Sequence, residues 1–264
     1  MRKNAVILPL SAAILGLCGF FLRSFEVRSI YDPTTGLFLR HTAVTTALVL
    51  LSVVVFVYCI LTCVSIGKKY TASEEFSEAF YQKTPLYLVI SVILGLGWLV
   101  LSVDYLINQI NQSPSFPVID VVFMILSALS AVAIIVLARG AKMRKSGGGM
   151  LVWSVIPPIF LCLWLILTYK DHASSPDLLM YAFTYLAVAF STLSFYYTAG
   201  YVYGKTAAGR TVLSYMMTIF LSIVILADTF TPRYIRLLFV VILVYHAINA
   251  VVLIRNLQKR EMQS

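Results

Sequence analysis

Charged residues are scarce in this chain. They make up 12% of its 264 residues, whereas hydrophobic residues make up 60%. A soluble globular domain typically carries about 25% charged residues. So few charges cannot form the water-facing surface of a soluble domain of this size. The composition therefore excludes an ordinary soluble protein and indicates a chain whose solvent is lipid.

Motifs for catalysis and for metal binding are also lacking. The three histidines, His41, His172 and His246, are far apart, and the four cysteines all fall in apolar stretches. The sequence holds no His-Glu-x-x-His, no Gly-x-Ser-x-Gly and no phosphate-binding loop. We therefore expect no catalytic residue, no metal site and no cofactor, and we expect that the chain is not an enzyme.

Long apolar runs are what the sequence has in abundance. The clearest extends from Thr42 to Gly67 without a charged residue, and a helix crosses a bilayer with about 20 apolar residues. Barrel strands would alternate apolar and polar residues, which these runs do not. We predict an all-α, polytopic membrane helix bundle that forms one integral membrane domain over residues 1–264. Its eight transmembrane helices are expected at Ala5–Leu22, Thr42–Gly67, Thr84–Ile107, Pro117–Ala138, Met150–Tyr169, Pro176–Tyr203, Thr211–Asp228 and Tyr234–Ile254.

The distribution of basic residues predicts the orientation. If the N-terminus is inside, the cytoplasmic segments hold 14 of the 20 basic residues. These are Arg2, Lys3, Lys68, Lys69, Lys83, Arg139, Lys142, Arg144, Lys145, Lys205, Arg210, Arg255, Lys259 and Arg260. The outer loops would hold the other six, namely Arg23, Arg28, Arg40, Lys170, Arg233 and Arg236. Cytoplasmic loops are enriched in Lys and Arg, so both termini are expected in the cytoplasm.

The net charge of +9 does not indicate a nucleic-acid partner. The basic residues are divided among five short segments and do not form one basic face. The partner that the sequence indicates is the lipid bilayer. A small solute or a partner protein remains open, and so does the oligomeric state.

Two loops carry signals for short elements. The alternating run 25–31, a turn containing Pro33 and Gly36, and the run 37–40 predict a small β-hairpin. The segment Thr71-Ala72-Ser73-Glu74 has a capping-box pattern, and Phe76, Phe80 and Tyr81 follow it at helical spacing. This segment predicts a short amphipathic helix at the cytoplasmic interface, either packed on the bundle or docking a partner.

The basic, glycine-rich segment 142–149 divides the chain into halves 1–145 and 150–264, which share sparse landmarks. Pro9 and the Pro157-Pro158 pair lie early in the first span of each half. Asp104 and Asp228 lie near the outer end of each third span. These landmarks are consistent with a 4+4 parallel repeat, as in some transporters. The alternative is chance similarity between apolar helices.

A few polar residues inside the spans are the candidate site. His246 and Asn249 lie one helical turn apart near the middle of the last span, and Asp104 and Asp228 lie toward the outer side. Burying such groups in lipid is costly, so they should face protein or water. Together with a helix broken at Pro157 and Pro158, they would line a polar cavity of a transporter. The alternatives are ordinary hydrogen bonds between helices, which Ser, Thr, Asn and His often supply, and prolines that only bend the helix.

The segment 31–37, Tyr-Asp-Pro-Thr-Thr-Gly-Leu, follows the first span and Arg23 and precedes the long second span. In this first quarter the chain resembles uncharacterised multi-pass membrane proteins of clostridia-like Gram-positive bacteria. The resemblance implies a bacterial plasma-membrane location and no particular activity.

The sequence favours passive or secondary transport of a small solute through a permease whose cavity lies between the two halves. The alternative is a non-catalytic membrane subunit or scaffold that binds a partner protein. A water-accessible cavity lined by Asp104, His246 and the proline-containing span would favour transport. A solid bundle with a large exposed apolar groove would favour the subunit.

Overall fold

A computed structural model of the chain describes residues 4–29, 31–32, 37–38, 43–112, 118–144, 148–173 and 178–259. Within them, 7 helices are long and apolar enough to cross a membrane. Large apolar side chains such as Phe21, Leu61 and Val100 lie exposed on these helices, as expected for surfaces in contact with lipid. By its helix composition the chain is an integral multi-pass membrane protein, as the sequence predicts.

The described residues form nine α-helices, one 3₁₀ helix and four two-residue strands. The α-helices are α1 (Asn4–Ser29), α2 (Ala43–Lys69), α3 (Phe76–Ala79), α4 (Leu86–Gln112), α5 (Val118–Met143), α6 (Gly148–His172), α7 (Ala182–Val202), α8 (Ala208–Ile225) and α9 (Arg233–Asn256). The others are η1 (Leu178–Tyr181), β1 (Tyr31–Asp32), β2 (Leu37–Phe38), β3 (Tyr70–Thr71) and β4 (Gln258–Lys259).

Each of the eight expected spans contains an α-helix, but α7 is not among the 7 candidate spans. Its 21 residues include many hydroxyl groups. Hydrogen bonds to α8 satisfy part of this polar face: Ser194 Oγ meets Thr218 Oγ1 at 2.8 Å, and Thr198 Oγ1 meets the Tyr215 hydroxyl at 2.6 Å. Hydroxyl side chains of α7 and α8 therefore form hydrogen bonds between the two helices.

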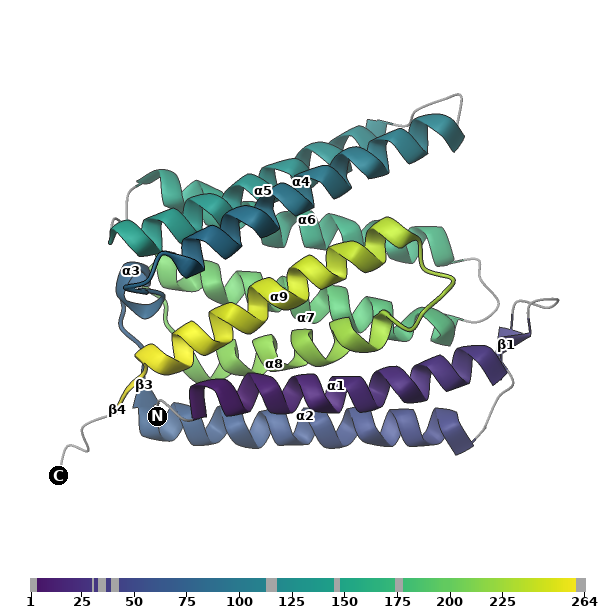
Figure 1. The fold of residues 1–264 in the computed structure, drawn as a ribbon, viewed down its shortest axis with the longest axis horizontal. Coiled ribbons are helices and arrows are strands. Elements are labelled where there is room, and N and C mark those ends of the chain that lie inside the picture. The colour runs from purple at the N-terminus through teal and green to yellow at the C-terminus, as the bar shows by residue number, and fades with distance from the viewer. Residues whose placement is uncertain are drawn as a thin grey trace.

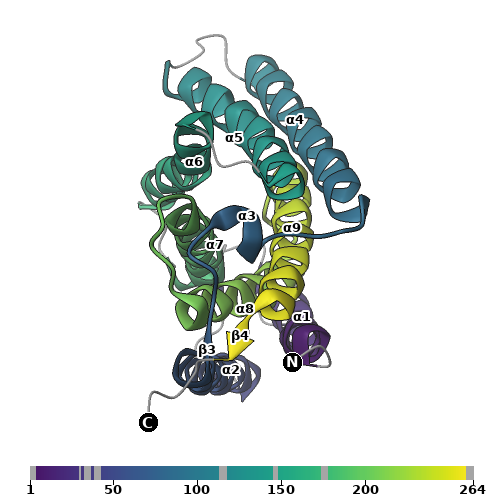
Figure 2. The same ribbon diagram turned by 90° about the vertical axis from the view of Figure 1, so that its left-hand side faces the viewer.

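Six helices, α4 to α9, form a closed ring in chain order, because each packs against the next and α9 packs back against α4. Figure 2 shows this ring end-on, with α1 and α2 outside it. Both outer helices pack on α8. As a result 83% of the apolar window of α8 is buried, against 17% of that of α2. The chain is thus a six-helix ring with a helix pair attached to one wall.

The structure shows no 4+4 repeat. In the second half, α6 and α7 continue directly into the ring beside α8 and α9. In the first half, α1 and α2 pack on α8 and leave the ring positions to α4 and α5. The two halves are therefore arranged differently. The shared prolines and aspartates do not correspond to a structural repeat.

The helices run side by side between two ends, which Figure 1 places at left and right. We call them the α3 end, where α1 begins and α9 finishes, and the β1 end, where α1 finishes and α9 begins. At the α3 end, β3 pairs antiparallel with β4, so that Tyr70 lies opposite Lys259. This pairing ties the segment after α2 to the segment after α9.

Both predicted loop elements occur, in shorter form. The hairpin consists of Tyr31–Asp32 paired with Leu37–Phe38, because α1 continues to Ser29 and takes up the start of the expected first strand. The short helix is α3, one turn long. Its Phe76 and Phe80 are buried inside the ring and do not lie at a lipid interface. The remaining hairpin positions, 30, 33–36 and 39–40, lie outside the described residues.

The structure shows no helix break at Pro157 and Pro158, in line with the alternative that membrane helices tolerate prolines. Both residues are buried within α6, which continues from Gly148 to His172. Each proline removes one backbone donor, but the helix continues through the pair, as membrane helices often do. Pro9 likewise lies inside α1.

Aromatic side chains fill the centre of the ring. Phe123 lies 5.0 Å from Phe160, Phe160 lies 5.9 Å from Trp98, and Trp98 lies 6.2 Å from Phe195, measured between ring centroids. Such spacings are those of interacting aromatic pairs. Phe195 in turn contacts His246 at 4.6 Å. We call this series the aromatic column. It packs the interior between the two ends.

Candidate functional site

A cavity of about 290 Å³ lies at the β1 end, between α5, α6, the start of α7 and the turn that joins α8 to α9. Sites for small molecules begin near this size. Six aromatic side chains contribute to its wall: Tyr105, Phe123, Trp164, Tyr181, Phe230 and Tyr234. Phe123 also belongs to the aromatic column, so the column forms the floor of the cavity.

Polar side chains from three helices line the same cavity. Asp120 lies in the first turn of α5, Lys170 and His172 in the last turn of α6, and Thr184 at the start of α7. The Tyr105 hydroxyl donates to Asp120 Oδ1 at 2.9 Å. The His172 ring lies 3.6 Å from that of Tyr181, with Nδ1 2.7 Å from the carbonyl oxygen of Thr168.

Thr184 stands out among these polar groups. Its side chain is buried, and its Oγ1 has no hydrogen-bond partner among the described residues. Buried hydroxyl groups are normally paired with protein or water. A buried hydroxyl that lines a cavity is therefore available to a polar molecule inside it.

A second, more open hollow of about 640 Å³ adjoins this cavity and shares Tyr105, Gln109, Pro232 and Tyr234 with it. Asp104 lines this hollow and is exposed. Its backbone carbonyl accepts a hydrogen bond from Asn108 Nδ2 at 2.8 Å. Arg233 lines the same hollow. Asp104 therefore lies on an accessible surface beside the cavity.

A small void of about 10 Å³ lies at the cavity floor, beside Phe123 and Trp164. A void of this size has room for about one water molecule. Ser102 and Ser127 also line it, their hydroxyl oxygens lie 2.7 Å apart, and Trp98 Nε1 donates to Ser127 Oγ at 3.0 Å. The floor of the cavity is thus partly polar.

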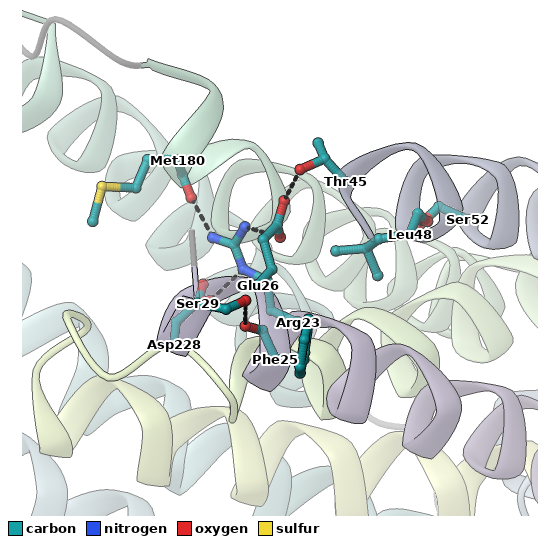
Figure 3. A network of polar contacts seen from close by, with 9 residues as sticks. All are labelled: Arg23, Phe25, Glu26, Ser29, Thr45, Leu48, Ser52, Met180 and Asp228. Carbon is teal, nitrogen blue, oxygen red and sulfur yellow. Dashed lines mark hydrogen bonds and ion pairs between the residues drawn. The ribbon is translucent and has the colours of Figure 1, made fainter. Parts of the chain in front are cut away.

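The described ion pairs are both made by one residue, Arg23 on α1 (Figure 3). Its Nε donates to Asp228 Oδ1 at 2.6 Å, its Nη1 to Glu26 Oε2 at 2.8 Å, and its Nη2 to the carbonyl oxygen of Met180 at 2.7 Å. The guanidinium carbon also lies 5.4 Å from the centre of the Phe183 ring. This buried cluster joins α1 to η1 and to the α8–α9 turn.

Two carboxylates share the single guanidinium of Arg23, and this sets the electrostatics of the cluster. Burial raises the pKa of the Asp228 carboxyl to about 6, while Arg23 opposes the rise and Glu26 adds to it. Asp228 Oδ2 has no hydrogen-bond partner among the described residues. Burial, the largest of these causes, therefore makes Asp228 easier to protonate than an aspartate in water.

Arg23 was expected in an outer loop, and the structure corrects this. The residue lies inside α1, is 2% exposed, and pairs with acids on the protein side. A lone basic residue at the end of an apolar run has no sequence signal that identifies its partner. The buried cluster was therefore missed, although Asp228 was among the candidates.

His246 and Asn249 lie inside the ring and away from the cavity. Their residues are 0% and 1% exposed. His246 Nδ1 lies 2.8 Å from the carbonyl oxygen of Ile242, and Nε2 has no partner in the described part of the chain. Asn249 Oδ1 accepts from the Tyr87 hydroxyl at 2.8 Å. Asn249 thus joins α9 to α4.

The α3 end of the ring is closed by the segment around α3, which Figure 2 shows at the centre of the ring. Phe80 packs edge-on against Tyr201 at 5.4 Å, and Phe76 stacks on Phe80 at 4.9 Å. Asn256 Nδ2 lies 3.0 Å from the carbonyl oxygens of both Ala79 and Tyr81. We call residues 76–81, with these contacts, the α3 plug.

The sequence-predicted candidates do not come together in one place. Asp104 borders the open hollow, Asp228 belongs to the Arg23 cluster, and His246 and Asn249 lie in the ring interior. Pro157 and Pro158 are buried in α6, and neither they nor His246 line the 290 Å³ cavity. Of the cavity residues, Lys170, His172 and Trp164 gave no sequence signal beyond their residue type. Metal-ligating groups of three or more are absent from the part of the chain that the structure describes.

Comparisons of the chain with protein-family models, with curated proteins and with solved structures find no match.

Proposed function

We propose that this membrane protein is a permease that binds a small solute in the 290 Å³ cavity at the β1 end. One observation carries the proposal: the cavity lies within a closed helix ring and combines aromatic walls with opposite charges and a buried, unpartnered hydroxyl. Small-molecule sites have this combination of apolar walls and a few polar groups.

The two ends of the ring differ in a way that suits alternating access. At the β1 end the cavity adjoins the open hollow that Asp104 lines. At the other end the aromatic column and the α3 plug fill the ring. A carrier open to one side and closed to the other is one state of such a cycle, and the opposite state would require the plug to move.

The proposal includes the orientation and the cell membrane. The α3 end carries most of the basic residues, among them Lys68, Lys69, Lys142, Arg144 and Arg255. The positive-inside rule then places the α3 end, and with it both termini, in the cytoplasm of a bacterium and the cavity on the outer side of the plasma membrane. Here α7 serves as the eighth span, and the protein performs no covalent chemistry on its solute.

Uptake into proteoliposomes tests transport. We expect purified protein to mediate saturable entry of a solute from a panel of labelled amino acids, sugars and organic acids. Trp164→Ala should reduce that entry at least tenfold, because Trp164 lines the cavity. Trp153→Ala, on the same helix and outside the cavity wall, is the matched control. Entry of no solute, or equal loss in both variants, would contradict the proposal.

A non-catalytic subunit is the second candidate function, and the α1–α2 pair favours it. This pair lies outside the ring, and α2 exposes apolar side chains such as Leu50, Val54 and Leu61. In that case a partner helix would replace lipid on α2, and Trp164→Ala would leave the cellular phenotype intact.

A further inference from the structure

The walls of the 290 Å³ cavity carry charges of opposite sign. Lys170 comes from the last turn of α6 and Asp120 from the first turn of α5. The ion pairs of the described residues both belong to Arg23, so these two charges line one cavity without neutralising each other. A ligand between them would meet one cationic and one anionic partner.

The surfaces around these charges are aromatic. Trp164 lies 6.4 Å from Phe123 in the floor, and Tyr181 lies 5.6 Å from Phe230 at the wall. Aromatic rings prefer offset or edge-on neighbours at such distances, and a further ring would find the same partners here. Thr184 Oγ1, buried and without a described partner, adds a hydrogen-bonding group near the α7 start.

We infer that the cavity takes a small zwitterion with an aromatic body, its carboxylate toward Lys170, its ammonium toward Asp120 and its ring against Trp164 and Phe123. This inference deepens the proposed permease function and names the substrate class of the same site. A simple anion would lie in the same cavity as the Asp120 carboxylate, and a simple cation would lie near the Lys170 ammonium. Only a zwitterion gives both charges a partner, and like charges close together are unfavourable.

Three probes that share one ring and one chain length separate these possibilities. They are L-phenylalanine (zwitterion), 3-phenylpropanoate (anion) and phenethylamine (cation). Purified protein in detergent is titrated with each, and the shift of the thermal unfolding midpoint gives the apparent Kd, since a ligand of the native state raises stability with its concentration. We expect L-phenylalanine to bind at least tenfold more tightly than either of the others.

Charge-removing variants provide the decisive comparison. Lys170→Gln should weaken L-phenylalanine at least tenfold and strengthen phenethylamine, because the like charge is gone, so that phenethylamine becomes the best of the three ligands. Asp120→Asn should weaken it similarly and make 3-phenylpropanoate the best. The controls Lys205→Gln and Asp104→Asn change charges outside this cavity and should leave the order unchanged. No binding of L-phenylalanine, equal binding of all three probes, or an order that the cavity variants do not alter would overturn the inference.

The same probes separate this inference from the transport proposal. Binding of L-phenylalanine with the expected variant pattern, but without uptake into proteoliposomes, would support the ligand class and reject the permease. Uptake of other solutes that L-phenylalanine does not inhibit would support the permease and reject the ligand class.

Discussion

Arg23 on α1 and Asp228 in the α8–α9 turn are separated by 205 positions in the sequence, yet their Nε and Oδ1 atoms lie 2.6 Å apart. Both side chains are buried, and Glu26 and the carbonyl of Met180 also accept hydrogen bonds from the guanidinium. The contact fastens the outer helix pair to the wall of the ring at its β1 end.

Arg23→Met should strongly destabilise the protein. The change leaves two buried carboxylates without their cation, and loss of one partner of a buried ion pair costs about 3–5 kcal/mol. The midpoint of thermal unfolding in detergent measures the effect. Arg28→Met, at an exposed position of the same helix, is the matched control and should have little effect. Equal midpoints for the two variants would show that the cluster does not hold α1 in place.

Stability should depend on pH through Asp228. Because its folded-state pKa is raised from 3.8 to about 6, the folded protein binds this proton more tightly than the unfolded chain does. The stabilisation that comes from protonated Asp228 is fully present below pH of about 4 and is lost as the pH rises through about 6. As the pH rises over this range, the unfolding midpoint of the wild type should therefore decrease relative to that of Asp228→Asn. A difference that is constant, or that rises with pH, would contradict the expected direction.

Asn256→Ala should loosen the α3 plug. The amide of Asn256 donates to backbone carbonyls of the plug, and each such bond contributes roughly 1 kcal/mol net. A cysteine at Ser77, which is 1% exposed, reports opening through its rate of reaction with a soluble maleimide in a variant without native cysteines. We expect a rate increase of roughly thirtyfold, because two lost bonds correspond to about 2 kcal/mol. Asn108→Ala removes a comparable bond at the β1 end and should leave the rate unchanged.

Gly209→Ala should disturb the contact between α2 and α8. A Cβ atom at Gly209 would collide with the backbone carbonyl oxygen of Cys63, and backbone cannot move aside as a side-chain tip can. Overpacking of this kind costs about 1–3 kcal/mol, measured as a lower unfolding midpoint. Gly67 lies on α2, the helix of Cys63, and an added Cβ there meets nothing within 4 Å. Gly67→Ala should therefore leave the midpoint unchanged or raise it. The prediction fails if both variants behave alike.

Cysteine labelling tests the proposed orientation. In a variant without native cysteines, single cysteines at Ala173 and Lys205 lie at the β1 and α3 ends respectively, both at exposed positions. An impermeant maleimide should label position 173 in intact cells and should label position 205 only after the membrane is opened. Labelling of position 205 in intact cells would reverse the orientation.

The sequence alone determined the class of the protein and the location of its helices. Uncharged apolar runs such as Thr42–Gly67 leave no alternative to a helix, because only internal hydrogen bonds satisfy the backbone in lipid. Local signals also located the hairpin around Tyr31 and Leu37 and the helical turn at Phe76. These features depend on residues that are close together in the chain, and such short-range patterns can be read directly from the sequence.

Only the tertiary structure decided which helices meet and which residues share a site. Almost any apolar face can pack against another, so nothing in the sequence indicated that α4 to α9 close into a ring or that α1 and α2 lie outside it. The same holds for the partner of Arg23 and for the meeting of Asp120, Lys170, Thr184 and Trp164 around one cavity. These residues come from different helices, and their proximity follows from how the helices pack.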